Sequence, residues 1–279
     1  MLVGVYTSKD AVSGQDAKPD ATQLGLLLVK GSVSVEGTSS KKIVWKDTES
    51  SPQRLFGTQL DSWTRLIGSG GSGVEMKDET LVFPVEGTKK KAEGAEEGKT
   101  VSLIISSSKD FTKWTLSKGM SDDGCGSPSV VEWEGKLMMM TACDDGPRRV
   151  YESGDKGEEW TETLGTLSRV WGNNKKGEKA KAVGSGFITA TVGNDNDKRN
   201  VMLVTLPVYA EEDSNEKKKG KLHLWLTDNT HIVDIGPVSD DDAAASSLLY
   251  KSGTGEDKKE ELIALYEKKK GVEETSHGM

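Results

Sequence analysis

The sequence predicts an all-β fold made of repeated small sheets, and three observations support this prediction. Helical periodicity is nearly absent, and short runs rich in Val, Ile, Leu and Thr are separated by turns rich in Gly, Asp and Lys. Four apolar runs begin 56, 64 and 61 residues apart. Trp-Thr dipeptides recur at Trp63, Trp114 and Trp160, which are 51 and 46 residues apart. Repeated strand–turn–strand units of this size favour a propeller over a sandwich, because each small sheet completes its core against its neighbours.

The four apolar runs are the strands that we expect inside each repeat. Each run follows an earlier strand and a tight turn, and the first three are followed by a further strand. The runs are Thr80–Val85, Lys136–Thr141, Asn200–Thr205 and Glu261–Tyr266, and the strands after the first three are Thr100–Ile105, Arg148–Tyr151 and Lys221–Leu226. Inserts rich in Lys, Glu and Gly separate the strands and bury too little apolar area to order themselves, so we expect solvated loops. The inserts are Gly87–Lys99, Asn173–Lys181, Asn194–Asn200, Glu211–Lys221 and Ser252–Glu261.

The two cysteines flank a predicted hairpin. Ser129–Trp133 and Lys136–Thr141 read as its strands, with a two-residue Glu-Gly turn between them. If Trp133 faces the residue after that turn, Cys125 and Cys143 fall almost opposite each other past the open end. A cross-strand disulfide and two buried free thiols remain as alternatives. Two cysteines are too few for a disulfide scaffold or a zinc site.

Composition and charge exclude some classes of function. The chain has 279 residues, 34% of them hydrophobic and 29% charged, with a formal net charge of −8. Because no long basic stripe outweighs this negative charge, we expect no nucleic-acid partner. No apolar run approaches the roughly 20 residues of a membrane helix, so we expect no transmembrane segment. The first residues lack the pattern of a signal peptide, and the last lack a lipid-anchor signal.

Other candidate motifs do not predict a catalytic or cofactor-binding site. The glycine-rich stretch 68–73 resembles a phosphate loop only in its glycine count, so we expect a bend between strands. The three histidines have no metal-ligand spacing, and we expect neither a metal nor another cofactor. Arg148, Arg149 and Arg169 are candidates for anion contacts or for surface salt bridges.

The segment from Ser153 to Trp160 fits S-x-D-x-G-x-x-W, the Asp box of sialidases, which is a BNR-type repeat. Asp155 and Ser153 are expected to bind nearby backbone amides. Gly157 supplies a positive φ, and Trp160 packs the turn against its sheet. The motif is therefore expected to be structural. Ser108-Lys109-Asp110 followed by Trp114 looks like a degenerate second copy, one residue short.

A longer segment, residues 124–172, resembles the trypanosomal trans-sialidase superfamily, as do LHLWLTDN at Leu222–Asn229 and SSLLYKSG at Ser246–Gly253. The resemblance covers essentially the whole chain. It implies a six-bladed sialidase propeller followed by a lectin-like domain. Residues 1–279 look like an incomplete all-β propeller made of the middle and later blades, without the lectin-like domain. The family also implies a cell-surface or secreted glycoprotein.

The resemblance also implies exo-α-sialidase or transfer chemistry without a metal. Three arginines clamp the sugar carboxylate, a tyrosine polarised by a glutamate attacks the anomeric carbon, and an aspartate protonates the leaving oxygen. The matching positions in this chain hold other residues. Ser127 stands for the glutamate, Ala142 for one arginine, Lys219 for another and Ala245 for the tyrosine. Because these losses affect one concerted unit, the chain is expected to be a pseudoenzyme with no intact catalytic residue.

Three functional hypotheses follow. The first is a non-catalytic surface protein for adhesion, antigenic variation or binding of host sialoglycans, matrix or cell-surface proteins. The second is residual sialidase or trans-sialidase activity on terminal α-linked sialic acid, with Ser246, Ser247 or water as nucleophile; Ser246 has no His or Lys base nearby in the sequence. The third is a truncated product without a stable fold, because open blade faces and unpaired strand edges invite aggregation.

Overall fold

The computed structural model describes residues 2–4, 26–36, 40–46, 56, 61–90, 98–171, 183–193, 197–209, 220–253 and 259–269. In this part of the chain the named elements are strands, each paired antiparallel to its neighbours, so the all-β prediction is confirmed. The three larger sheets are formed by consecutive strands. The first contains β5 (Trp63–Gly68), β6 (Val74–Glu75), β7 (Leu81–Lys89), β8 (Thr100–Ser107) and β9 (Trp114–Leu116). The second contains β10 (Cys125–Trp133), β11 (Lys136–Cys143), β12 (Arg149–Ser153) and β13 (Thr161–Glu162). The third contains β14 (Gly186–Val192), β15 (Arg199–Tyr209), β16 (Gly220–Thr227) and β17 (Ile232–Pro237).

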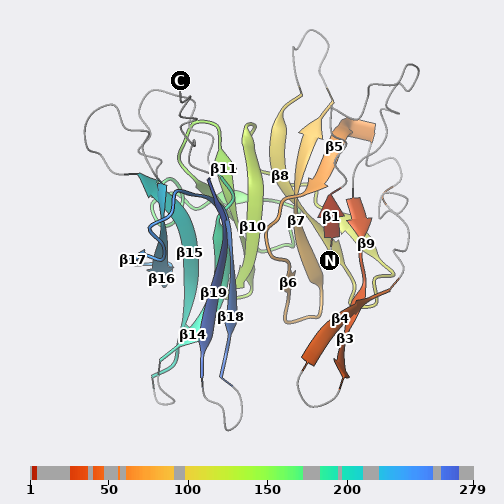
Figure 1. The fold of residues 1–279 in the computed structure, drawn as a ribbon. Helices are drawn as coiled ribbons and strands as arrows, with labels where there is room; N and C mark the ends of the chain where they lie inside the picture. The colour runs from red at the N-terminus through yellow and green to blue at the C-terminus, as the bar shows by residue number, and fades with distance from the viewer. Residues whose placement is uncertain are drawn as a thin grey trace, which may run out of the picture.

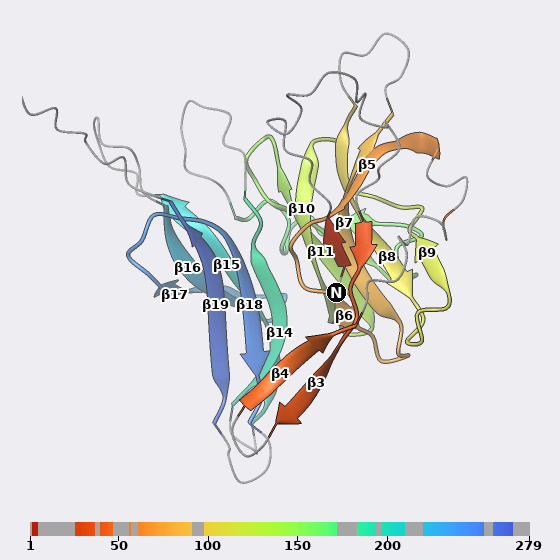
Figure 2. The same ribbon diagram turned by 45° about the vertical axis from the view of Figure 1, so that its right-hand side comes forward.

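Three further pairs of strands complete the described structure. They are β1 (Leu2–Gly4) with β2 (Leu26–Leu28), β3 (Gly31–Glu36) with β4 (Ser40–Trp45), and β18 (Ala243–Lys251) with β19 (Glu261–Lys268). The β10–β13 sheet lies between the other two large sheets (Figure 1). The β3–β4 hairpin projects away from the large sheets, as the turned view shows (Figure 2). Neither N-terminal pair was predicted from the sequence.

Each large sheet buries side chains against the next. Met138 and Met140 of β11 join a core cluster with Phe187 and Met202 of the third sheet. Met139 points to the opposite face and joins a cluster with residues of β7 and β8. All three methionines are at most 2% exposed. Because successive side chains of a strand face opposite sides, an unbroken apolar run is what a strand covered on both faces requires.

The predicted strands are present, and some predicted loop boundaries are wrong. The four apolar runs correspond to β7, β11, β15 and β19, and the strands after the first three to β8, β12 and β16. Strands extend into the ends of four inserts, so that residues 87–89, 199–200, 220–221 and 261 belong to strands. The insert Asn173–Lys181 lies outside the described residues.

Gly87 explains one of these errors. It looks like a loop residue in the sequence, yet it pairs with Val101 and Leu66 within β7. A Cβ atom at this position would lie 2.5 Å from the Trp63 ring. The glycine therefore makes room for a buried indole inside a strand, and a close approach of this kind leaves no local signal in the sequence.

The predicted hairpin has the expected register. Trp133 faces Lys136, and Cys125 faces Cys143 at the open end. Both turn residues have a positive φ, 50° at Glu134 and 82° at Gly135. A two-residue turn of this type matches the twist of antiparallel strands.

Candidate functional site

A cavity of about 420 Å³ opens beside the first residues of the inner strands β10, β14 and β18. We call it the Ser127 cavity. Its lining is Ser69, Gly70, Gly71, Ser127, Ser129, Gly184, Ser185, Ala245, Ser246, Ser247, Leu265, Tyr266 and Glu267. The bend after β5 supplies the two glycines, as expected for the glycine-rich stretch. A volume of this size lies within the roughly 300–1,000 Å³ of small-molecule sites.

The structure brings together in this cavity two of the four positions that the family resemblance predicted. A methyl group placed on Gly184 would lie 3.7 Å from Ser127 Cβ and 4.0 Å from Ala245 Cβ. The backbone N–H of Ser246 donates to the carbonyl of Gly184 at 3.1 Å, and this bond holds the beginning of β18 beside Gly184. Ser127 adopts a positive φ of 47° at the irregular beginning of β10. Residues from two different sheets thus meet across one glycine.

The other two family positions differ in their placement. Ala142 pairs with Gly126, the neighbour of Ser127, and is 9% exposed. It therefore lies beside the cavity but does not line it. Lys219 lies outside the described residues.

Hydrogen bonds hold the wall of the cavity in place. The hydroxyl of Ser129 donates to the carbonyl of Ser185 at 2.8 Å, and that of Ser69 donates to the carbonyl of Pro128 at 2.7 Å. Arg148 reaches the same wall, donating through Nε to Ser185 Oγ at 2.7 Å and through Nη2 to the Val183 carbonyl at 3.0 Å. Burial lowers the pKa of Arg148 to about 10. Arg148 is 3% exposed, so the expectation of a surface salt bridge is wrong for this residue.

Ser246 lacks the surroundings of an activated nucleophile. Its hydroxyl lies 3.0 Å from Thr205 Oγ1 and 3.4 Å from the backbone nitrogen of Gly186. Neither group can remove its proton at neutral pH, whereas a serine nucleophile needs an adjacent base. The described contacts therefore give no support to Ser246 as an alternative nucleophile.

Glu86 is a neighbour of the site that the sequence did not reveal. Its carboxylate accepts a hydrogen bond from the backbone N–H of Ser127 at 3.0 Å. A Cβ at Gly126 would lie 2.5 Å from the same carboxylate oxygen, so a larger residue there would displace this carboxylate. The available signal was a single acidic residue directly after the apolar run in β7, but its partner is 41 residues away in sequence.

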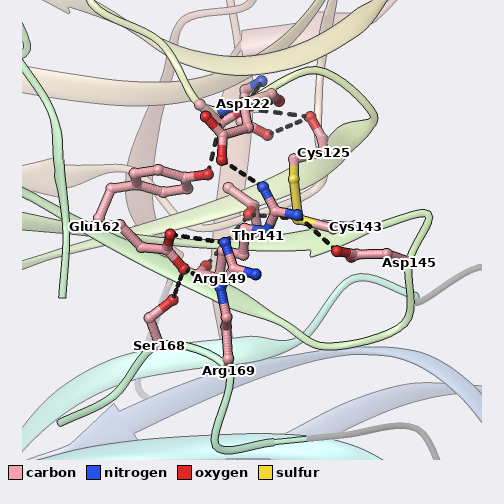
Figure 3. Close-up of polar contacts among 12 residues, drawn as sticks. Asp122, Cys125, Thr141, Cys143, Asp145, Arg149, Glu162, Ser168 and Arg169 are labelled. Atoms are coloured by element: carbon pink, nitrogen blue, oxygen red, sulfur yellow. Dashed lines mark hydrogen bonds and ion pairs between the residues drawn. A yellow bond between two sulfur atoms is a disulfide. The ribbon is translucent and has the colours of Figure 1, made fainter. Parts of the chain in front are cut away.

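Arg149 and Arg169 form ion pairs beside the cysteine pair (Figure 3). Arg149 contacts Asp122 and Asp145, with Nη2 of Arg149 2.6 Å from Asp145 Oδ2. Arg169 Nε lies 2.8 Å from Glu162 Oε1. In the same region the sulfur atoms of Cys125 and Cys143 are bonded as a disulfide. The ion pairs use both terminal nitrogens of Arg149, and Nε and Nη2 of Arg169.

The Asp-box residues form a compact turn. Ser153 Oγ donates to Asp155 Oδ1 at 2.7 Å and accepts from the Gly157 N–H at 2.8 Å. The backbone N–H of Glu159 donates to Asp155, and this bond is the main reason why the pKa of Asp155 is lowered. Gly157 has a φ of +88°, and a Cβ there would lie 2.9 Å from Ile104. Trp160 packs against the core cluster between the first two sheets. These contacts are within the fold, away from the Ser127 cavity lining.

The degenerate copy has the same local bonding. Ser108 Oγ donates to Asp110 Oδ1 at 2.6 Å, and the backbone N–H of Thr112 donates to the same oxygen at 3.1 Å. Phe111, three residues after Ser108, has a φ of 61°, as Lys156 has a φ of 60° three residues after Ser153. The turn therefore tolerates the missing residue because its hydrogen bonds depend on the Ser and Asp side chains.

These turn carboxylates predict acid sensitivity. Hydrogen bonds led by that from the Ser108 hydroxyl lower the pKa of Asp110 to about 2, and a bond led by the Lys156 side chain does the same for Asp78. A carboxyl with a lowered folded-state pKa adds stability above its unfolded pKa of about 3.9, and loses it as pH falls toward 2. We expect the free energy of unfolding, measured by urea denaturation, to fall between pH 4 and pH 2. The fall should be smaller in Asp110→Asn, and an identical fall in both proteins would contradict this assignment.

The described residues contain no helix long and apolar enough to cross a membrane. In the same part of the chain, no three His, Cys, Asp or Glu side chains are placed to hold a metal ion.

The family model of the BNR repeat-like domain matches residues 1–267. Sialidase 85-1.1 of Trypanosoma cruzi is 35% identical over 266 residues, covering 89% of this chain and 34% of that protein. A second Trypanosoma cruzi sialidase is 34% identical over 258 residues, covering 90% of this chain and 21% of that protein. The chain thus spans about a third or less of the length of these relatives.

Solved structures show the same relationship in three dimensions. Trypanosoma rangeli sialidase in complex with sialic acid matches with a TM-score of 0.70 and 31% identity, over 88% of this chain and 36% of that one. The same enzyme in complex with the inhibitor DANA matches with a TM-score of 0.73 and 30% identity, over 96% of this chain and 41% of that one. The described sheets are accordingly blades of a sialidase-type β-propeller. This chain belongs to the BNR-repeat sialidase superfamily.

Proposed function

We propose that this chain is a non-catalytic member of the sialidase superfamily that binds glycans at a cell surface or as a secreted protein. The observation that supports the proposal is the lining of the Ser127 cavity. Ser127 and Ala245, which match the family's glutamate and tyrosine, lie on either side of Gly184 with a serine hydroxyl and a methyl group. Neither side chain can act as the nucleophile or its carboxylate partner in sialoside cleavage.

The clamp for the sugar carboxylate is weakened in the same region. Ala142 has no charge where the family has an arginine, and a planar guanidinium is the group that holds a carboxylate with two hydrogen bonds. The nucleophile, its carboxylate partner and one arginine of the clamp are therefore lost together. Binding without turnover is the activity that this arrangement supports, with host sialoglycans or matrix glycoproteins as the proposed partner class.

Hydrolysis of a fluorogenic sialoside tests this proposal. The purified chain, shown by circular dichroism to be folded β-structure, should turn over the substrate at least about 10⁴-fold more slowly than Trypanosoma rangeli sialidase, because a nucleophile and its partners act as one unit. Turnover that DANA inhibits would overturn the proposal and favour residual sialidase activity. Ser246→Ala and Ser247→Ala would then show whether either hydroxyl supplies the nucleophile.

A further inference from the structure

The described lining of the Ser127 cavity has an unusual charge for a site that the family resemblance matches to a sialic-acid pocket. Among the described residues that line it, none is Lys or Arg, and the acidic one is Glu267. Glu86 adds a second carboxylate just behind Ser127. A carboxylated sugar entering this cavity would lose hydration and gain no opposing charge from the described residues of its wall.

The buried cation nearby does not replace the arginine clamp. Arg148 lies behind Ser185, and two of its nitrogens already donate to Ser185 Oγ and to the Val183 carbonyl. Ser185 separates this guanidinium from the cavity, whose lining does not include Arg148. A bidentate contact needs both nitrogens of one guanidinium edge to face the carboxylate.

Hydroxyl groups are what the cavity offers instead. Ser127 and Ser247 line it, and neither hydroxyl has a hydrogen-bond partner among the described residues. A serine hydroxyl both donates and accepts, so it matches the hydroxyls of a sugar. Tyr266 also lines the cavity while its own hydroxyl is held by Ser239 and Asp241 at 2.8 and 2.9 Å. Its ring therefore has a fixed position at the wall.

From this lining we infer that the Ser127 cavity takes an uncharged, hydroxyl-rich sugar and disfavours a carboxylated sugar such as sialic acid. The inference rests on the proposed function, because a cavity that binds without turnover is the starting point. It specifies the proposed glycan binding further: the groups that this cavity contacts are the neutral sugars of the glycan.

A matched pair of ligands isolates the effect of charge. Saturation-transfer NMR and calorimetric titration would compare the methyl glycoside of N-acetylneuraminic acid with the methyl ester of the same compound, and with methyl β-galactoside. The ester and the galactoside should bind, and the free acid should bind at least about tenfold more weakly, because its carboxylate has no charged partner among the described lining residues. Glu267→Gln removes the acidic side chain of the lining and should therefore reduce the difference in affinity between the free acid and the ester.

A glycine variant locates the binding in the cavity. A Cβ on Gly184 would meet Ser127 and Ala245 at ordinary contact distances, so the backbone leaves room for a side chain there. The larger side chain of Gly184→Leu should therefore fill the space between these two residues. This variant should lose the ester and galactoside signals at an unchanged melting temperature. Gly154→Leu is the matched control, because a Cβ at Gly154 meets nothing within 4 Å, and it should bind as the parent does. If Gly184→Leu fails to fold, Gly184→Ala gives the same comparison with a smaller loss.

The outcomes separate this inference from the proposed function. Free acid binding as well as or better than the ester would overturn the inference, and so would the absence of binding by all three sugars. Both results would leave the finding on sialoside hydrolysis unchanged. Sialoside turnover would instead overturn the proposed function on which the inference rests.

Discussion

Met139→Ala should lower the free energy of unfolding by about 3 kcal/mol, because the removed atoms leave a cavity between two sheets. Met139 is 0% exposed and lies on β11, the second strand of the central sheet. Its side chain packs with Val82 and Ile104 of the preceding sheet. The surrounding sheets contact one another over many residues and are expected to collapse only in part around the gap. Urea denaturation followed by circular dichroism measures the change.

Two controls test the reason for this loss. Met139→Leu keeps nearly the same volume and should cost less than about 1.5 kcal/mol. Leu164→Ala removes a similar number of atoms from a side chain that is 66% exposed, and should change stability by no more than about 0.5 kcal/mol. Equal losses in Met139→Ala and Leu164→Ala would show that the packing between the first two sheets contributes little.

The core strands could be predicted because their pattern is local. The run KLMMMT has no polar alternation, and the structure shows why: Met138 and Met140 meet the third sheet while Met139 meets the first. A strand covered on both faces needs apolar residues at every position. The N-terminal hairpin β3–β4 lacked such a signal, because Val33 and Ile43 are 65% and 56% exposed and no buried face imposes a pattern.

The candidate site could be predicted only in part. The family resemblance predicted candidate positions, but Ser127 and Ala245 lie on either side of Gly184, which is 57 residues after the first and 61 before the second. Contacts between residues so far apart in the sequence depend on how the sheets are stacked, and no local periodicity predicts them. Arg148 shows the same limit, since its buried contact with Ser185 spans 37 residues, whereas the sequence suggested an anion contact or a surface salt bridge.

Removing the Cys125–Cys143 disulfide should cost about 3 kcal/mol of unfolding free energy, because the bond closes a loop with a sequence separation of 18 in the unfolded chain. The bond also restrains the site. Cys125 begins β10 two residues before Ser127, and Cys143 follows Ala142 directly. The double variant Cys125→Ala/Cys143→Ala should therefore be less stable, and its Ser127 amide should exchange hydrogen faster, since the end of the hairpin is no longer closed.

The parent chain provides the internal comparison. Adding a reductant to the parent should lower its denaturation midpoint to near that of the double variant, while the double variant should not respond to reductant. Both are followed by urea denaturation at one pH. A parent that unfolds at the same midpoint with and without reductant, although thiol titration shows the bond to be broken, would contradict the prediction. In that event the pairing of β10 with β11 from Ser129 onward, together with the hydrogen bond from the Ser127 N–H to Glu86, would be sufficient to hold Ser127 at the cavity.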